Sequence, residues 1–180
     1  MAVAEPWQKA EIPGPLKASV ITKPEVVAAM LKRAKRPLLV LGHEVVQTEV
    51  GGENAIDNFI RIAKASTIPV VATAHVFPEF VKRDLKPAAW MPAVDIANRL
   101  KDPDWRGFDG KGNYDLLLIA GIPYHMEWVI LSGLKHFSLD LKTICLDRFY
   151  QPHATWSFAN ISLRDWYDNL EMIVKLLGGK

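Results

Sequence analysis

The amino-acid sequence predicts an α/β protein, a three-layer and doubly wound parallel sheet of about six strands with helices on both faces. Short runs of unbroken apolar residues recur along the 180-residue chain, and segments with the apolar period of a helix separate them. Unbroken apolarity is typical of strands that are covered on both faces. Strands that alternate with helices are joined by right-handed crossovers. We expect a single domain over residues 1–180, which is long enough to bury its own core.

The chain is expected to begin with an extended arm over residues 1–20. Pro6, Pro13 and Pro15 lie there beside Gly14, and proline disfavours helix at its own position and at the preceding residue. The opening residues lack the apolar core of a signal peptide, and no later stretch is long enough to span a membrane. We therefore expect a cytoplasmic protein.

The first helix is predicted to start at a capping box. Thr22 can accept a hydrogen bond from the amide of Glu25 while Glu25 reaches back, and Ile21 can pack on Val26. Pro37 disfavours helix at the residue before it, so the helix should end near there. The residues expected on its buried face are Val27, Met30, Leu31 and Ala34.

Four buried strands and three more main helices are expected after that point. The strands are predicted at residues 38–41, 68–73, 116–120 and 143–146. One helix carries an apolar face of Ile56, Phe59, Ile60 and Ala63, and a further segment of helical period covers residues 92–100. Pro123 suits the first position of a helix whose apolar residues are Met126, Val129, Ile130 and Phe137. Ser162 is the expected cap of the last helix, which carries Trp166, Leu170, Ile173 and Leu177 and is followed by Gly178.

Composition excludes several classes of function. The net charge of +2 is too small to predict nucleic-acid binding. Cys145 is the only cysteine and lies in an apolar run, so we expect a buried thiol, no intramolecular disulfide and no iron–sulfur cluster held by this chain alone. The loop at residues 101–113 is polar and rich in glycine, and its aspartates do not match a calcium-binding loop.

Candidate binding residues follow the predicted strands, because ligands of open α/β sheets bind beyond the carboxyl ends of the strands. Gly42, His43 and Glu44 follow the first strand, Thr73 ends the second, Gly121 follows the third and Asp147 follows the last. The run from His43 to Gln47 resembles a zinc-protease motif, but Gln47 stands where the second histidine is required, so no metal site is predicted. His75 has the same two readings as His43, contact with a ligand or with local backbone, whereas His125, His136 and His153 are expected at the surface or an interface.

Neither of the common phosphate-binding glycine motifs occurs, and no catalytic nucleophile can be paired with a base. A looser anion site is one interpretation of Gly51 and Gly52, which precede a helix expected near Glu53. Gly42 would then allow close approach of a nucleotide, and Asp147 could bind a ribose hydroxyl. The alternative is that these glycines serve only the fold. We predict no catalytic residue.

Three segments resemble the central domain of thiamine-diphosphate enzymes. They are residues 34–74 (AKRPLLVLGHEVVQTEVGGENAIDNFIRIAKASTIPVVATA), 114–124 (YDLLLIAGIPY) and 141–149 (LKTICLDRF). That domain shares the NAD/FAD-binding fold of deoxyhypusine synthase and sirtuins, so the resemblance implies a Rossmann-like sheet with FAD or another nucleotide at strand ends. A complete thiamine enzyme needs more domains, and the zinc cysteines of a sirtuin are missing.

Over nearly all of its length, the chain resembles the epsilon subunits of archaeal acetyl-CoA decarbonylase/synthase complexes. The segments PWQKAEIPGP, KRPLLVLGHE, ASTIPVVATAH and DLLLIAGIPYHMEW carry this resemblance. It implies a non-catalytic accessory of one-carbon metabolism that binds the CO dehydrogenase alpha subunit in an alpha-two, epsilon-two component of a larger multisubunit complex. Nickel and iron–sulfur centres would lie in alpha, and the epsilon chain would stabilise alpha or help pass electrons to FAD.

Docking on a partner requires exposed apolar side chains. Trp7, Phe77, Trp90 and Trp128 are the residues that we expect at such an interface. Self-association of the isolated chain is a further expectation. The alternative function is a free-standing flavin- or NAD-dependent oxidoreductase that uses Gly42, Gly121 and Asp147.

Overall fold

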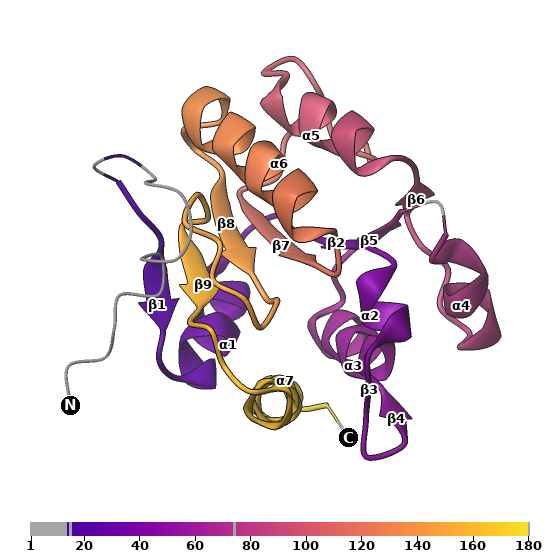
Figure 1. Ribbon diagram of the computed structural model, residues 1–180. Coiled ribbons are helices and arrows are strands. Elements are labelled where there is room, and N and C mark those ends of the chain that lie inside the picture. The colour runs from indigo at the N-terminus through magenta and orange to yellow at the C-terminus, as the bar shows by residue number, and fades with distance from the viewer. Residues whose placement is uncertain (1–13, 15, 74, 180) are drawn as a thin grey trace.

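Seven parallel strands form the central sheet of the computed structural model, which describes residues 14, 16–73 and 75–179 (Figure 1). Their spatial order is β1-β9-β8-β7-β2-β5-β6. The strands are β1 (Ser19–Ile21), β2 (Pro37–Leu41), β5 (Val70–Ala72), β6 (Ala89–Trp90), β7 (Leu116–Ala120), β8 (Lys142–Cys145) and β9 (Trp156–Phe158). The predicted fold class is confirmed, with one strand more than expected.

The winding of the sheet reverses direction at its centre. From β2 the chain moves outward to β5 and β6, then returns to the other side of β2 as β7 and continues through β8 to β9. Leu39 of β2 is paired with Val70 on one side and with Leu118 on the other. Such a reversal leaves a crevice at the carboxyl ends of the two strands where it occurs. Here those strands are β2 and β7.

Helices cover both faces of the sheet (Figure 1). On one face lie α1 (Pro24–Arg33), α3 (Ala55–Ser66) and α7 (Leu163–Leu176), and on the other lie α5 (Ala93–Lys101) and α6 (Tyr124–Phe137). Two short helices, α2 (Glu44–Gln47) and α4 (Phe77–Lys82), follow β2 and β5. No helix within the described ranges is long and apolar enough to cross a membrane.

The N-terminal segment ends in a strand that the sequence did not reveal. Residues 1–13 and 15 of the predicted arm, Trp7 included, lie outside the described residues. Ser19 to Ile21 form β1, which pairs in parallel with β9. The amide of Ala18 donates to the carbonyl of Pro152 at 3.0 Å, so the segment before β1 is already held against the body of the domain.

The predicted capping box of the first helix is wrong. The N-cap residue is Lys23, its side chain makes no capping hydrogen bond, and Pro24 occupies the first helical turn. Proline at this position has no N–H to satisfy and its backbone angle already suits a helix. Thr22 is therefore one residue too early to cap the helix. The C-terminal prediction holds, because α1 ends at Arg33, before Pro37.

The last helix has the predicted cap. The Ser162 hydroxyl accepts a hydrogen bond from the amide of Asp165 at 3.1 Å. Trp166, Leu170 and Ile173 are buried, as expected, and Gly178 follows the helix with a φ of +83°. Packing of this face against α1 and α3 holds the three helices on one side of the sheet.

Only one of the four apolar residues that the sequence places on α6 is buried. Ile130 is buried, but Met126, Val129 and Phe137 are exposed, and the residues that face the sheet are Glu127, Ile130, Leu131 and Leu134. The helix is apolar on both sides, so periodicity alone could not decide which side packs inward.

The loop between α5 and β7 lacks regular structure, as predicted for residues 101–113. Arg36 fixes it to the end of α1 through two hydrogen bonds to Asp109, at 3.1 and 2.6 Å, and one to the carbonyl of Gly112 at 2.9 Å. The guanidinium of Arg36 is the largest of the effects that lower the pKa of Asp109, to about 2.

Candidate functional site

Two glycines close the sheet at the point where its winding reverses. Gly42 follows β2, and its N–H donates to the carbonyl of Ala120 at 2.8 Å. A Cβ atom on Gly42 would lie 2.1 Å from the carbonyl oxygen of Gly121, and one on Gly121 would lie 2.5 Å from Cγ1 of Val45. Gly121 also has a φ of +72°, which favours glycine. The two backbones therefore pack directly on each other.

The backbone amides around these glycines already have acceptors. The N–H of Glu44 donates to the carbonyl of Gly121 at 2.9 Å, and the N–H of Gly121 donates to both carboxylate oxygens of Asp147 at 2.9 Å. A diphosphate at a strand end is normally held by unpaired amides. The amides of Gly42, Glu44 and Gly121 cannot serve that purpose without breaking bonds of the fold.

Asp147 belongs to a buried acidic cluster that includes a residue not found from the sequence. A carboxyl oxygen of Glu127, the Cys145 sulfur and a carboxyl oxygen of Asp147 lie within 4.8 Å of one another. Glu127 is 1% exposed, and the Nε2 of Gln151 donates to its Oε2 at 3.3 Å. Its other oxygen, Oε1, is buried and has no hydrogen-bond partner among the described residues. Two carboxylates this close repel each other, and a proton shared by the pair would relieve that repulsion.

The environment raises the pKa values of all three groups in this cluster. Burial, and then the charge of Asp147, raises the pKa of Glu127 well above its ordinary value. Burial raises the pKa of Asp147 to about 6, although hydrogen bonds from Glu127 and Gly121 oppose that effect. Burial also raises the pKa of the Cys145 thiol, which is fully enclosed as predicted. Burial therefore favours a proton on Glu127, beside Asp147.

A cavity of 280 Å³ opens beside this cluster, and we call it the switch-point crevice. Its acidic lining residues are Glu44, Glu127 and Asp147, and Arg148 is the one lining cation. The Arg148 guanidinium stacks over the ring of Phe149 at 4.0 Å from its centroid. The remaining walls are Val45, Gln47, Thr48, Ile122, Tyr124 and Trp166.

The chemistry of the crevice suits neutral or cationic groups. The carboxyl groups of Glu44 and Asp147 would repel a diphosphate when they are ionised, and Glu127 offers it no positive charge. The volume of 280 Å³ is also below the range that holds most drug-sized ligands, roughly 300–1,000 Å³. The residues here do not fit the diphosphate of FAD or NAD. A metal ion could replace the shared proton, because carboxylates and a thiolate are zinc ligands, but the thiol would have to lose its proton first.

The other candidate residues lie apart from the crevice or at its margin. His43 is the half-buried N-cap of α2, and Glu44 is exposed at the crevice rim. Thr73 ends β5 and its amide donates to the carbonyl of Leu41 at 2.9 Å, but it does not line the cavity. His75, His125 and His136 are exposed. His153 is 7% exposed, so the expectation of a surface histidine is wrong for that residue.

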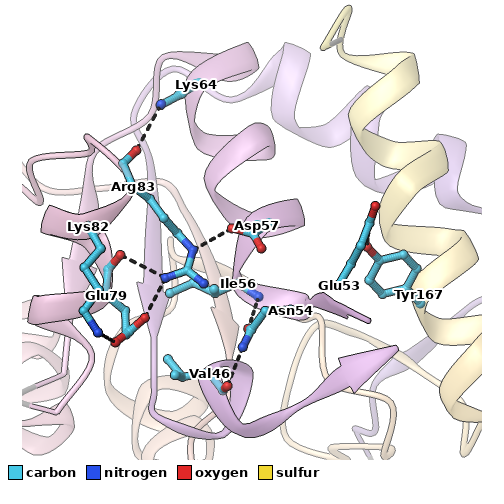
Figure 2. Close-up of polar contacts among 10 residues, drawn as sticks. All are labelled: Val46, Glu53, Asn54, Ile56, Asp57, Lys64, Glu79, Lys82, Arg83 and Tyr167. Carbon is cyan, nitrogen blue, oxygen red and sulfur yellow. Dashed lines mark hydrogen bonds and ion pairs between the residues drawn. The ribbon is translucent and has the colours of Figure 1, made fainter. Parts of the chain in front are cut away.

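Gly51 and Gly52 form the tip of a hairpin rather than the start of a helix. Strand β3 (Glu49–Val50) and strand β4 (Glu53–Asn54) pair around them, and both glycines have positive φ. The following helix begins at Ala55, two residues after Glu53 and close to its expected start. Its cap is Asn54, which accepts from the amide of Ile56 and donates to the carbonyl of Val46 (Figure 2).

One side-chain hydrogen bond holds the hairpin to α7, and a set of ion pairs beside it joins α3 to α4 (Figure 2). The hydroxyl of Tyr167 on α7 donates to the carboxylate of Glu53, which fixes β4. Arg83, after α4, binds Asp57 of α3 and Glu79 of α4, each at 2.6 Å. These contacts give the hairpin and α4 structural partners.

Of the expected interface residues, Trp90 is 64% exposed. Phe77 is half-buried, and its ring centroid lies 6.1 Å from that of Trp90. Trp128 is half-buried, with its ring against His153 at 4.6 Å between centroids.

Comparison with known proteins gives one consistent result. The family model described as "CO dehydrogenase beta subunit/acetyl-CoA synthase epsilon subunit" matches residues 2–175. A relative from Archaeoglobus fulgidus, named acetyl-CoA decarbonylase/synthase complex subunit epsilon 1, is 42% identical over 142 residues, which is 78% of this chain and 73% of that protein.

Epsilon subunits from methanogens are similar in the same way. The protein from Methanothrix soehngenii is 37% identical over 158 residues, which cover 87% of this chain and 81% of its own length. The protein from Methanothermobacter thermautotrophicus is 34% identical over 166 residues, 92% of each chain. The chain thus belongs to the family of CO dehydrogenase beta subunits and acetyl-CoA synthase epsilon subunits.

Proposed function

We propose that this chain is a non-catalytic epsilon-type subunit of an acetyl-CoA decarbonylase/synthase complex. In this proposal it binds the CO dehydrogenase alpha subunit through the outer face of α6 and stabilises that subunit. Membership of the family and the names of the relatives support a role within such a complex. The single structural observation that carries the proposal is the apolar outer face of α6.

That face has the form of a docking surface. Met126, Val129 and Phe137 lie on one stripe of the helix, spaced three and then eight residues apart, with Gly133 between the last two. Val129 is 63% exposed and Phe137 is 73% exposed. An exposed apolar stripe on a helix is typical of a surface that a partner covers. The inner face of α6 is covered by the sheet, so its outer face is left for a partner.

Charge around the stripe indicates the kind of partner surface. The acidic and basic residues of α6 are His125, Glu127, Lys135 and His136, and Glu127 is buried. The rim of the stripe is therefore neutral to positive. A complementary surface on alpha would be apolar at its centre and acidic at its edge.

Co-purification of this chain with the alpha subunit tests the proposal. We expect Val129→Glu to abolish co-purification, because it places an unpaired charge at the centre of the interface. Met172→Glu is the matched control, since Met172 is an exposed apolar residue on α7, on the opposite face of the sheet. Retention of alpha by the Val129→Glu chain would exclude this face.

A second measurement addresses the stabilising role. Heat inactivation of CO oxidation by alpha should be slower with the wild-type chain present than without it, and Val129→Glu should remove the difference. Equal inactivation rates with and without the wild-type chain would contradict stabilisation.

Electron transfer to FAD stays a prediction and is not part of this proposal, because the residues of the switch-point crevice do not fit a dinucleotide. The same reason argues against a free-standing oxidoreductase. Calorimetric titration of the isolated chain with FAD and NAD separates the two functions. Saturable binding that is lost in an Asp147→Asn chain would favour the oxidoreductase, whereas no binding would favour the accessory subunit.

A further inference from the structure

The switch-point crevice is lined by accessible charges of both signs that are not paired with each other. Glu44 is exposed at the rim, and Arg148 is half-buried in the wall. No ion pair among the described residues involves the carboxylate of Glu44 or the guanidinium of Arg148. Both groups are therefore available to a molecule that enters the crevice.

Arg148 is held in one orientation without using its hydrogen-bond donors. Its guanidinium stacks over the ring of Phe149, 4.0 Å from the ring centroid, and its carbonyl accepts from the amide of Ile161 at 3.1 Å. Stacking occupies a face of the planar group, whereas the N–H donors lie in its plane. The free edge of the guanidinium has the geometry that binds a carboxylate through two parallel hydrogen bonds.

Two carboxyl groups of the same crevice lie close enough to repel each other. Burial is the main cause of the raised pKa of Asp147, and the negative charge of Glu44 raises it further. Arg148 is the one lining cation, and it forms an ion pair with neither of them. A primary ammonium group carries a positive charge and three donors, so it would relieve the repulsion between these carboxyl groups.

The size and walls of the crevice limit the ligand further. Its volume of 280 Å³ is roughly that of nine water molecules in the liquid, which suits a small molecule. Val45, Ile122 and Trp166 contribute apolar walls, against which a short chain of methylene groups can lie. The position is also the one at which ligands of doubly wound sheets usually bind, beyond the strands where the winding reverses.

We propose that the switch-point crevice binds a small aliphatic amino acid in its zwitterionic form. The ammonium group lies between Glu44 and Asp147, and the carboxylate lies on the free edge of Arg148. Such a ligand carries no net charge, in keeping with a crevice that repels diphosphates. The site is independent of docking through the outer face of α6, so failure of either leaves the other standing.

Three probes of similar size test the proposal: 4-aminobutanoate, butanoate, which lacks the amine, and butylamine, which lacks the carboxylate. Each is titrated into the full chain in low salt, and the backbone amide signals of residues 44–48 and 147–149 are followed by NMR. We expect saturable shifts, with 4-aminobutanoate bound about tenfold more tightly than either other probe, because only it makes both charge-assisted contacts. Equal affinities for the three probes, or no saturable shift at these residues, would overturn the proposal.

Two variants separate the two ends of the ligand. Arg148→Met should weaken 4-aminobutanoate about tenfold and leave butylamine unchanged, whereas Glu44→Gln should weaken butylamine and leave butanoate unchanged. Arg106→Met and Glu49→Gln are the matched controls, since both residues are exposed and neither lines the crevice. An equal loss for all three probes in either crevice variant would mean that the charges are not recognised separately, which would contradict the proposal.

Discussion

The two cavities at opposite edges of the sheet carry opposite charge, although α6 and residues 147–155 contribute to both. Glu127 and Asp147 line the switch-point crevice. The basic cavity is the 380 Å³ cavity where β1, β8 and β9 begin, and its lining includes Lys135, Lys142 and His153. The carboxyl edge, where a nucleotide would be expected, is acidic, and the amides of Gly42, Glu44 and Gly121 there already have acceptors. The amino edge is basic. The fold determines where cavities form, but the side chains determine what each can hold.

The largest effect should come from the glycine contact that closes the switch-point crevice. In Gly42→Ala the new methyl group would lie 2.1 Å from a backbone oxygen, which cannot move without disturbing β7. We expect a loss of about 3 kcal/mol in the free energy of unfolding, measured by denaturant titration.

Gly133→Ala is the matched control for that substitution. Gly133 lies within α6, and its nearest neighbour to a new Cβ is a lysine carbon at 4.0 Å. We expect this change to stabilise the chain by about 0.5–1 kcal/mol. A Gly42→Ala chain as stable as the control would show that the two strands can separate at this point.

Proton binding by the acidic crevice should make stability depend on pH. Glu127 and Asp147 have raised pKa values in the folded state, so the folded chain holds protons that the unfolded chain releases. The stabilisation is present in full below their unfolded pKa values, 4.5 and 3.8, and is lost as pH rises through the folded values.

Glu127→Gln should therefore reduce the fall in unfolding free energy between pH 5 and pH 8, by about 1–2 kcal/mol. The pKa of His153 is lowered in the folded chain, so the stability that this residue contributes is lost as pH falls. That contribution is the same in both chains and cancels when Glu127→Gln is compared with wild type. Parallel pH profiles for the two chains would contradict a shared proton in the crevice.

An ion-pair network provides a reference for the two cavities, because in each cavity charges of mainly one sign lie together without such pairs. Arg83 is bound to Asp57 and Glu79, and its side chain is 23% exposed (Figure 2). Arg83→Met should lower the free energy of unfolding by about 1 kcal/mol in low salt and by less in high salt, because salt screens such pairs. The control is Arg106→Met, in the loop before β7. A loss that does not change with salt would point to packing rather than charge.

The smallest effect concerns the basic cavity. The charge of Lys135 is the second cause, after burial, of the lowered pKa of His153. Lys135→Gln should raise that pKa, as followed by histidine NMR. Lys86→Gln should leave it unchanged. A lowered pKa in the Lys135→Gln chain would mean that the substitution mainly increases the burial of the ring.

The sequence predicted the central strands well, because β2, β5 and β7 are apolar throughout and β8 ends in the apolar pair Ile144-Cys145. It missed β1, β6 and β9, which have two or three residues and depend on neighbouring strands for their form. The pair Gly51-Gly52 was a usable hairpin signal, since two glycines with positive φ suit a two-residue turn.

The position of the candidate site could be predicted from the sequence, but its buried pair of carboxyl groups could not. Asp147 was found because it ends a buried strand. Glu127 gave no signal, because a single acidic residue on an apolar helix normally faces water, and only tertiary packing brings it to Asp147. Similarly, nothing near His153 in sequence indicates that it is buried close enough to Lys135 of α6 to feel its charge.

The single thiol of Cys145 gives the protein a built-in reporter. It is completely enclosed in β8, and its pKa is raised, so an alkylating reagent should meet an unreactive group in the native chain. Labelling then requires the centre of the sheet to open. The modification rate would therefore report how often the domain opens, with no engineered probe, and its slowing on addition of a ligand or a partner would measure how strongly each one binds to the closed form.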